Sequence, residues 1–125
     1  MTRFLIVFGA GGLGCGARYL VNLWVGERSF PVATLIVNVV GSFAMGLAIA
    51  LSLRLADFPA NLRLAITTGF LGGLTTYSAF NSESTTLALG GDYLRAFANV
   101  AITLVACAAA GLLGLALARA LTAAS

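Results

Sequence analysis

Long apolar runs between sparse charges set the fold class of this chain. Residues 29–53, 64–82 and 96–118 contain no charged side chain, and residues 4–25 are interrupted only by Arg18. A helix that spans a bilayer needs about 20 mostly apolar residues. The sequence therefore predicts an all-α membrane protein with four transmembrane helices, at about 4–25, 32–53, 63–89 and 96–118.

The composition agrees with this assignment. Hydrophobic residues make up 60% of the chain and charged residues 9%, whereas a soluble domain carries about 25% charged residues. The predicted connections are short, so we expect residues 1–125 to form a single transmembrane domain. The apolar run after Arg3 is too long for a signal peptide, and we interpret it as the first span.

The arginines give a weak topological signal. Four spans place both termini on one side of the membrane, and the chain contains no lysine. Four arginines then lie on the terminal side and two on the other, with Arg18 inside the first span: Arg3, Arg54, Arg63 and Arg119 against Arg28 and Arg95. The positive-inside rule needs a clear excess to fix an orientation. We therefore expect insertion both ways round, which is typical of a dual-topology protein that pairs as an antiparallel homodimer.

Several chemical functions are disfavoured. Histidine is absent, and Cys15 and Cys107 lie in different predicted spans without metal-ligand spacing. No nucleophile–base pair or metal set is visible, so we do not expect an enzyme. The net charge of +3 includes no basic run. We therefore expect contacts with the lipid bilayer and no nucleic-acid partner.

One motif at the start of the chain has a misleading form. Residues 9–14 (GAGGLG) follow an apolar stretch and match the dinucleotide-binding pattern G-x-G-x-x-G. That site also needs a βαβ unit and an acidic residue about 20 positions later, and the chain provides neither. We interpret these glycines as small residues that let helices pack closely in lipid.

A glycine pair and a threonine pair lie in the middle of the third predicted span, in residues 72–80 (GGLTTYSAF). Each glycine costs a helix about 1 kcal/mol relative to alanine. A break frees backbone N–H and C=O groups, which lipid cannot satisfy, so it is tolerated where it is buried in protein or lines a polar path. We predict that the third helix is broken near its middle, at a place where an ion is handled.

Polar side chains follow single faces of three predicted spans, because residues four apart share one face of a helix. They either hold helices together or line a path for a small ion. Tyr77 and Phe80 follow the predicted break, and their electropositive ring edges can contact an anion. The polar lines are Thr34, Asn38 and Ser42; Asn99, Thr103 and Cys107; Ser78 and Ser82; and Asn81 and Thr85.

Two charged residues lie within the predicted spans. Glu83 is the one carboxylate there, and such residues are functional candidates by default. It lies either at a solvated helix end or at a pore mouth. Arg18 either draws anions toward a vestibule or holds helices together near the interface, and we favour the structural role.

The sequence resembles the Fluc or CrcB family of fluoride channels over essentially its whole length. Three blocks carry the resemblance: residues 12–19 (GLGCGARY), 34–43 (TLIVNVVGSF) and 69–80 (GFLGGLTTYSAF). The third block is highly specific. Within it, Tyr77 and Ala79 depart from the phenylalanine and threonine that are usual in the family.

The resemblance implies a passive, fluoride-selective channel in the bacterial inner membrane, which lets fluoride leave the cytoplasm and protects the cell from fluoride toxicity. It implies an antiparallel homodimer with two pores and a structural sodium ion at the dimer centre. By the same resemblance, the backbone carbonyls of Gly72 and Thr75 would bind the sodium ion. The implied pore residues are Asn38, Tyr77, Ser78, Phe80, Asn99 and Thr103.

Two other functional classes stay open. A small four-helix proton-coupled drug exporter is also short and of dual topology, but it depends on a carboxylate in the first span. This chain has none there, so Glu83 would have to substitute. A membrane scaffold without transport is the third class, and it needs neither a broken helix nor polar lines.

Overall fold

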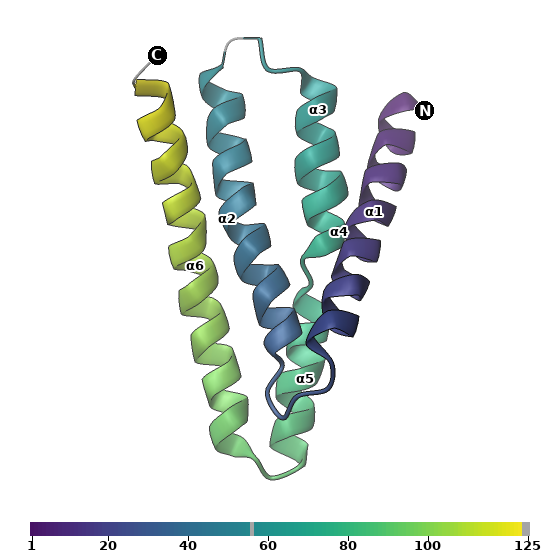
Figure 1. Ribbon diagram of the computed structural model, residues 1–125, viewed down its shortest axis with the longest axis vertical. Helices are drawn as coiled ribbons and strands as arrows, with labels where there is room; N and C mark the ends of the chain where they lie inside the picture. Colours follow the sequence, from purple (N-terminus) through teal and green to yellow (C-terminus); the bar gives the residue numbers. More distant parts are fainter. Residues whose placement is uncertain (56, 124–125) are drawn as a thin grey trace.

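The computed structural model describes residues 1–55 and 57–123, and all the regular structure in this part of the chain is helical. The prediction of an all-α protein is therefore confirmed. Figure 1 shows long helices that run alternately up and down, with the third crossing divided into segments. The elements are α1 (Thr2–Val25), α2 (Val32–Arg54), α3 (Ala60–Leu64), the π-helix η1 (Ala65–Leu71), α4 (Gly72–Leu74), α5 (Tyr77–Leu89) and α6 (Tyr93–Ala123).

Three of the described helices, α1, α2 and α6, are long and apolar enough to cross a membrane. Each contains the span predicted for it from the sequence. The third predicted span, 63–89, corresponds to the succession of α3, η1, α4 and α5, which is not one continuous helix. The chain is therefore a multi-pass membrane protein, and both termini lie at the same end of the molecule (Figure 1).

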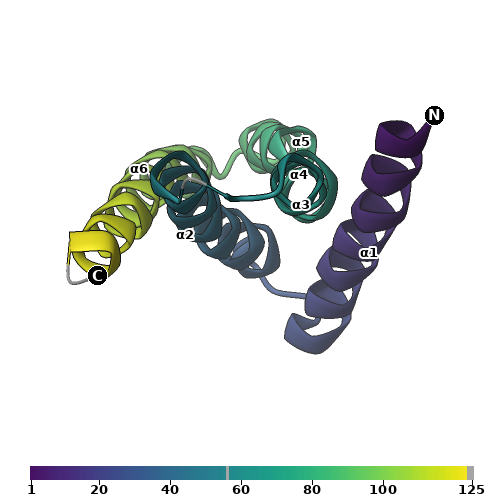
Figure 2. The ribbon, with the colours of Figure 1, turned by 90° about the horizontal axis from the view of Figure 1, so that it is seen from above.

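The crossings are arranged side by side. Seen from above, α6 and α2 neighbour each other, the third crossing follows, and α1 lies on the outer side (Figure 2). The most extensive packing is between α2 and α6, and α1 packs mainly on η1 and α4. The third crossing is thus held between α1 and the pair of α2 and α6.

Glycines allow these helices to approach closely. A Cβ atom added at Gly14 of α1 would collide with the carbonyl oxygen of Phe70, and one at Gly73 would collide with that of Gly11. Between α2 and α6, a Cβ at Gly46 would collide with the carbonyl oxygen of Gly111. This packing agrees with the interpretation of the first-span glycines as packing residues and leaves no role for a dinucleotide turn.

The buried interior is small, and much of the outer surface is apolar. Val37, Leu71 and Leu74 form the core cluster. Large apolar side chains such as Phe8 and Trp24 of α1 and Leu112 of α6 are exposed. Monomeric soluble proteins rarely expose continuous apolar faces of this kind, so these faces suit lipid or another membrane-embedded chain.

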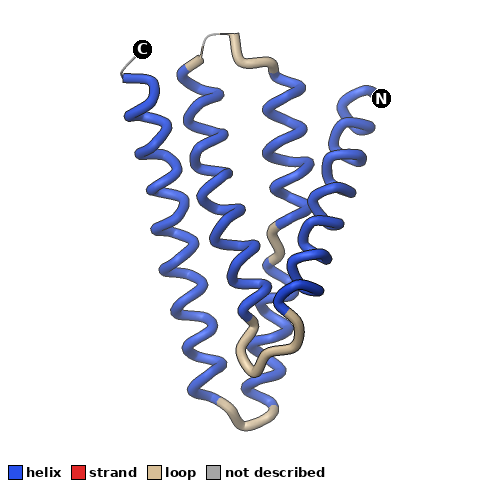
Figure 3. The backbone as a smooth tube through the Cα atoms, in the orientation of Figure 1, coloured by secondary structure: helices blue, strands red, loops and turns tan. Residues whose placement is uncertain are grey.

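The interruption of the third crossing lies at Thr75 and Thr76. Both have extended backbone, with ψ of 155° at Thr75 and φ and ψ of −152° and 119° at Thr76, and Figure 3 shows the resulting loop within the crossing. A third helix broken near its middle was predicted correctly, and the break falls within the predicted segment 72–80. Gly72 and Gly73 are both helical, and the missing side chain of Gly73 permits the close approach of α1. The residues with extended backbone are the β-branched threonines that follow.

Candidate functional site

Side chains satisfy the backbone groups that the break leaves without a helical partner. The N–H of Thr76 donates to Oδ1 of Asn38 at 2.8 Å, and Nδ2 of Asn38 donates to the carbonyl oxygen of Thr76 at 3.0 Å. Oγ1 of Thr76 accepts from the N–H of Ala79 at 3.2 Å and so caps the start of α5. The break is therefore an ordered element with its own hydrogen bonds, as a membrane interior requires.

The end of α4 presents backbone oxygens at the same place. The N–H and the hydroxyl of Thr75 both donate to the carbonyl oxygen of Leu71, at 3.0 and 2.9 Å. The last carbonyl oxygens of a helix have no partner within it. In α4, those are the carbonyl oxygens that come after that of Leu71 in the chain. Unwound carbonyls and half-helix C-terminal ends coordinate sodium in membrane transporters. Gly72 is the first residue of α4 and Thr75 directly follows it; their assignment to sodium by the resemblance stays a prediction.

Acidic or sulfur ligands are not gathered anywhere in the described part of the chain. No group of three or more His, Cys, Asp or Glu residues there could hold a metal ion. Cys15 and Cys107 are free thiols.

An open groove of about 690 Å³ runs beside the break, between α2, α5 and α6. It brings together five residues that the sequence had separated: Asn38, Thr75, Tyr77, Phe80 and Thr103. The polar lines of two helices face this groove together, since Ser42 of α2 and Cys107 of α6 also line it. None of the described residues that line it is charged.

Two aromatic rings, those of Tyr77 and Phe80, line this groove. Phe80 is 6% exposed, Tyr77 is 75% exposed, and their ring centroids are 5.6 Å apart with planes inclined by 57°. Ser78, between them in sequence, is exposed and is not among the residues that line the groove. Its hydroxyl lies 3.2 Å from Oγ1 of Thr76, so it belongs to the hydrogen bonding of the break.

Asn99 lies behind the groove, in the contact between α5 and α6. It is 1% exposed, and its Nδ2 donates to Oγ of Ser84 at 2.9 Å. Ser84 in turn donates to the carbonyl oxygen of Phe80 at 2.8 Å, and Thr103 donates to Oδ1 of Asn99 at 3.4 Å. A continuous polar chain thus connects the wall of the groove with the backbone of Phe80.

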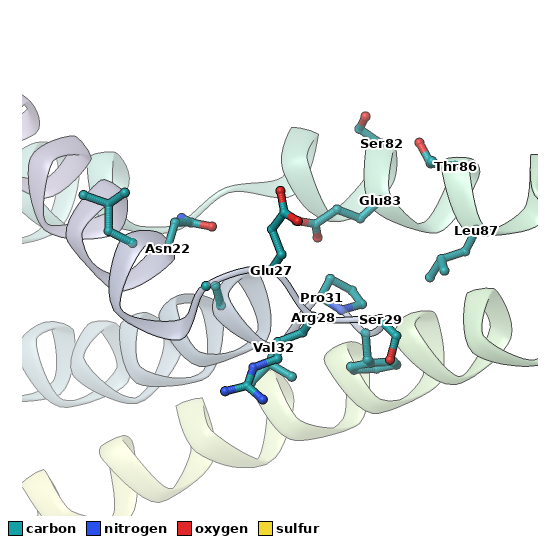
Figure 4. A pocket seen from close by; sticks show the side chains of 14 residues that line it. Asn22, Glu27, Arg28, Ser29, Pro31, Val32, Ser82, Glu83, Thr86 and Leu87 are labelled. Atoms are coloured by element: carbon teal, nitrogen blue, oxygen red, sulfur yellow. The ribbon is translucent and has the colours of Figure 1, made fainter.

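Glu83 lines a second cavity, of about 560 Å³, between α5 and the connection from α1 to α2. Oε1 of Glu83 accepts from the hydroxyl of Thr34 at 2.6 Å, and Oε2 is buried without a hydrogen-bond partner in the described part of the chain. Figure 4 shows the carboxylates of Glu83 and Glu27 in this cavity, with Asn22 and Ser82 on its walls. The structure thus places Glu83 at a cavity between helices and not at a freely solvated helix end.

Arg18 is separate from both cavities. Its Nη2 lies 3.7 Å from Sγ of Cys15, and its backbone oxygen accepts from Nδ2 of Asn22 at 2.9 Å. All these partners belong to α1 itself. Its structural role within the membrane stays a prediction.

Three residues that make hydrogen bonds at the break or at the two cavities were not assigned as site residues from the sequence. Thr76 caps α5, Ser84 links α5 to α6, and Thr34 binds Glu83. Thr34 belongs to a polar line that the sequence did reveal. A cap at Thr76 is detectable in principle, because threonine is a preferred residue before a helix start.

Comparison with known proteins gives consistent matches. The family described as CrcB-like protein, Camphor Resistance (CrcB), matches residues 5–115. A protein of Geobacter sp. (strain M21) named "Fluoride-specific ion channel FluC" is 44% identical over 124 residues, which cover 97% of this chain and 100% of the relative. A protein of the same name from Geobacter metallireducens is 46% identical over 112 residues, covering 87% and 90%.

A third relative of that name, from Bordetella petrii, is 43% identical over 119 residues, covering 95% of this chain and 93% of the relative. All three names describe ion channels, which are not enzymes. The expectation of a non-enzymatic protein is thereby borne out.

Proposed function

Since this chain belongs to the CrcB-like family, we propose that it is a fluoride-selective ion channel through which fluoride leaves the cytoplasm passively. Relatives named as fluoride-specific channels match it over nearly their whole length. The structural observation that carries the proposal is the uncharged groove beside the broken helix, lined by amide, hydroxyl and aromatic side chains. In the bacterial inner membrane, such a channel would protect the cell from fluoride toxicity.

The proposed pore follows this groove. Fluoride is small and binds water tightly, so a pore has to replace its hydration shell with hydrogen-bond donors. Hydroxyls, amides and ring edges do this without a full positive charge, which would hold the anion too firmly for it to leave. We assign this role to the groove residues and to the polar groups hydrogen-bonded behind them: Asn38, Tyr77, Ser78, Phe80, Asn99 and Thr103.

We further propose a homodimer of two inverted copies, with two pores and a structural sodium ion at its centre. The weak arginine bias and the exposed apolar faces of the single chain support the inverted pair. The carbonyls of Gly72, which begins α4, and of Thr75, which follows it, would hold the ion. When bound, sodium supplies a positive potential that favours an anion nearby.

Ion efflux from liposomes tests the function. Purified protein is reconstituted into liposomes loaded with potassium fluoride and potassium chloride, and valinomycin is added to carry the potassium. A fluoride electrode and a chloride electrode follow release. The proposal predicts rapid release of fluoride while chloride stays inside. Equal release rates for the two anions would contradict selectivity, and no release of either would contradict a channel.

A further inference from the structure

One carboxamide holds the backbone on both sides of a single residue. Asn38 accepts from the N–H of Thr76 and donates to the carbonyl of the same residue, at 2.8 and 3.0 Å. Asn38 and Thr76 are each 8% exposed, so water has little access to this pair. A carboxamide offers a strong acceptor and a strong donor in one plane, which neither an aliphatic side chain nor a carboxylate does, so asparagine suits this pairing.

The pairing fixes the direction of a neighbouring carbonyl. A peptide group is planar and trans, so its C=O and N–H point in opposite directions, and none of the described peptide bonds is cis. The N–H of Thr76 belongs to the same peptide group as the carbonyl of Thr75. By accepting from that N–H, Asn38 turns the Thr75 carbonyl to the opposite side of the break. Its bond to the Thr76 carbonyl fixes the next peptide plane as well.

We propose that Asn38 is a positioning residue for the cation, which aims the Thr75 carbonyl from a place in the wall of the anion groove. This inference rests on the proposed function, since it takes the cation to be sodium bound by that carbonyl. Asn38 lines the groove beside Tyr77 and Phe80 while its hydrogen bonds go to the break. It therefore connects the two ions physically, and a change at Asn38 has to alter sodium binding and not only fluoride passage.

Two measurements test the positioning role of Asn38. Both give the sodium midpoint, which is the sodium concentration at which half of the effect of sodium is reached. In the first, the unfolding temperature of the purified full-length protein is followed as sodium replaces N-methylglucamine at constant ionic strength, because a ligand that binds the folded state raises its stability. In the second, fluoride efflux from liposomes is measured over the same sodium series. The first readout does not depend on transport.

Three variants separate the possible roles. Asn38→Leu removes both hydrogen bonds at similar volume, and we expect its sodium midpoint to rise at least about tenfold, the equivalent of roughly 1.4 kcal/mol. Asn38→Asp keeps the acceptor for the Thr76 N–H, so its midpoint should rise less than that of the leucine variant, while efflux falls because a carboxylate lines the groove. Asn99→Leu is the matched control, since Asn99 is buried but bonds Ser84 and Thr103 and not the break. Its sodium midpoint in the unfolding measurement should equal that of the wild type, while its efflux is expected to fall because Asn99 belongs to the proposed pore.

The outcomes are distinct. Loss of efflux in Asn38→Leu with an unchanged sodium midpoint would overturn the inference and make Asn38 an anion ligand only. A uniform loss of stability at every sodium concentration would also overturn it and indicate a packing role. If Asn38→Leu does not fold, Asn38→Ser decides, because its short side chain cannot make both bonds and should show the same rise. A wild type that conducts fluoride without any sodium dependence refutes both the sodium site and this inference, but leaves the channel function standing.

Discussion

Phe80 is the residue at which burial, ring contact and position beside the break coincide. Its side chain is 6% exposed, lies against Tyr77 and lines the groove. We expect Phe80→Ile to cost about 1–3 kcal/mol of stability, as reshaped cores do, and to fold. Fluoride efflux should nevertheless fall strongly, because the ring edge that would contact the anion is lost. Efflux from liposomes and an unfolding curve on the same preparation measure the two effects.

Phe97 provides the control for this change. It lies on α6, is 72% exposed and does not line the groove, so Phe97→Ile should retain efflux. If the Phe80→Ile protein folds and conducts as fast as the wild type, the aromatic ring of Phe80 does not contribute to the pore. Folding with loss of efflux would instead exclude a scaffold without transport.

At the scale of the elements, apolar runs and spacing predicted the long helices well but not the details of the break. The spans at 4–25, 32–53 and 96–118 all lie within observed helices. The break lies in the predicted segment 72–80, but the glycines are not the residues that leave the helix. Glycine is a poor helix former, yet tertiary packing overrides that propensity, since Gly73 remains helical against α1. The π-helix Ala65–Leu71 has no signature in the periodicity.

The sequence indicated which polar and aromatic residues could line a path, but it did not indicate their hydrogen-bond partners. Four-residue spacing placed Asn99 and Thr103 on one face, and the structure shows them hydrogen-bonded. The hydrogen bonds between Asn38 and the Thr76 backbone join positions 38 residues apart in sequence. No local sequence pattern encodes such a contact. The hydrogen bond between Thr34 and Glu83 is also between positions far apart in sequence, so no local pattern predicts it.

The packing of α1 on the third crossing gives a prediction at this scale. A Cβ at Gly14 would collide with the backbone of Phe70, whereas one at Gly12 meets nothing within 4 Å in the single chain. We expect Gly14→Ala to destabilise the protein by about 1–3 kcal/mol. The added methyl group would press on backbone atoms, which cannot move aside as a flexible side chain could. Gly12→Ala should be neutral or stabilising, because alanine favours helix by about 1 kcal/mol. Thermal or denaturant unfolding in detergent compares them, and equal tolerance of both would contradict the described contact.

At the scale of the whole molecule, the arginines are divided between its two ends as the sequence predicted, with four at the end of the termini and two at the other. Arg3, Arg54, Arg63 and Arg119 belong to helix ends on the side of the termini, and Arg28 and Arg95 lie near the opposite connections. We expect a tag fused to the C-terminus to be cleaved by external protease in about half of the molecules, since this bias does not fix one orientation. Cleavage in none or in all of them would contradict the inverted homodimer.

A current recording across a planar bilayer tests the central claim, passive and selective fluoride conduction, most directly. With a tenfold fluoride gradient and an opposing tenfold chloride gradient at equal pH, the current should reverse at the fluoride equilibrium potential, about 59 mV in magnitude for a monovalent ion. A pH gradient at fixed fluoride should not move this potential. Reversal at the chloride potential would contradict selectivity. A shift with the proton gradient that Glu83→Gln abolishes would instead support the proton-coupled exporter.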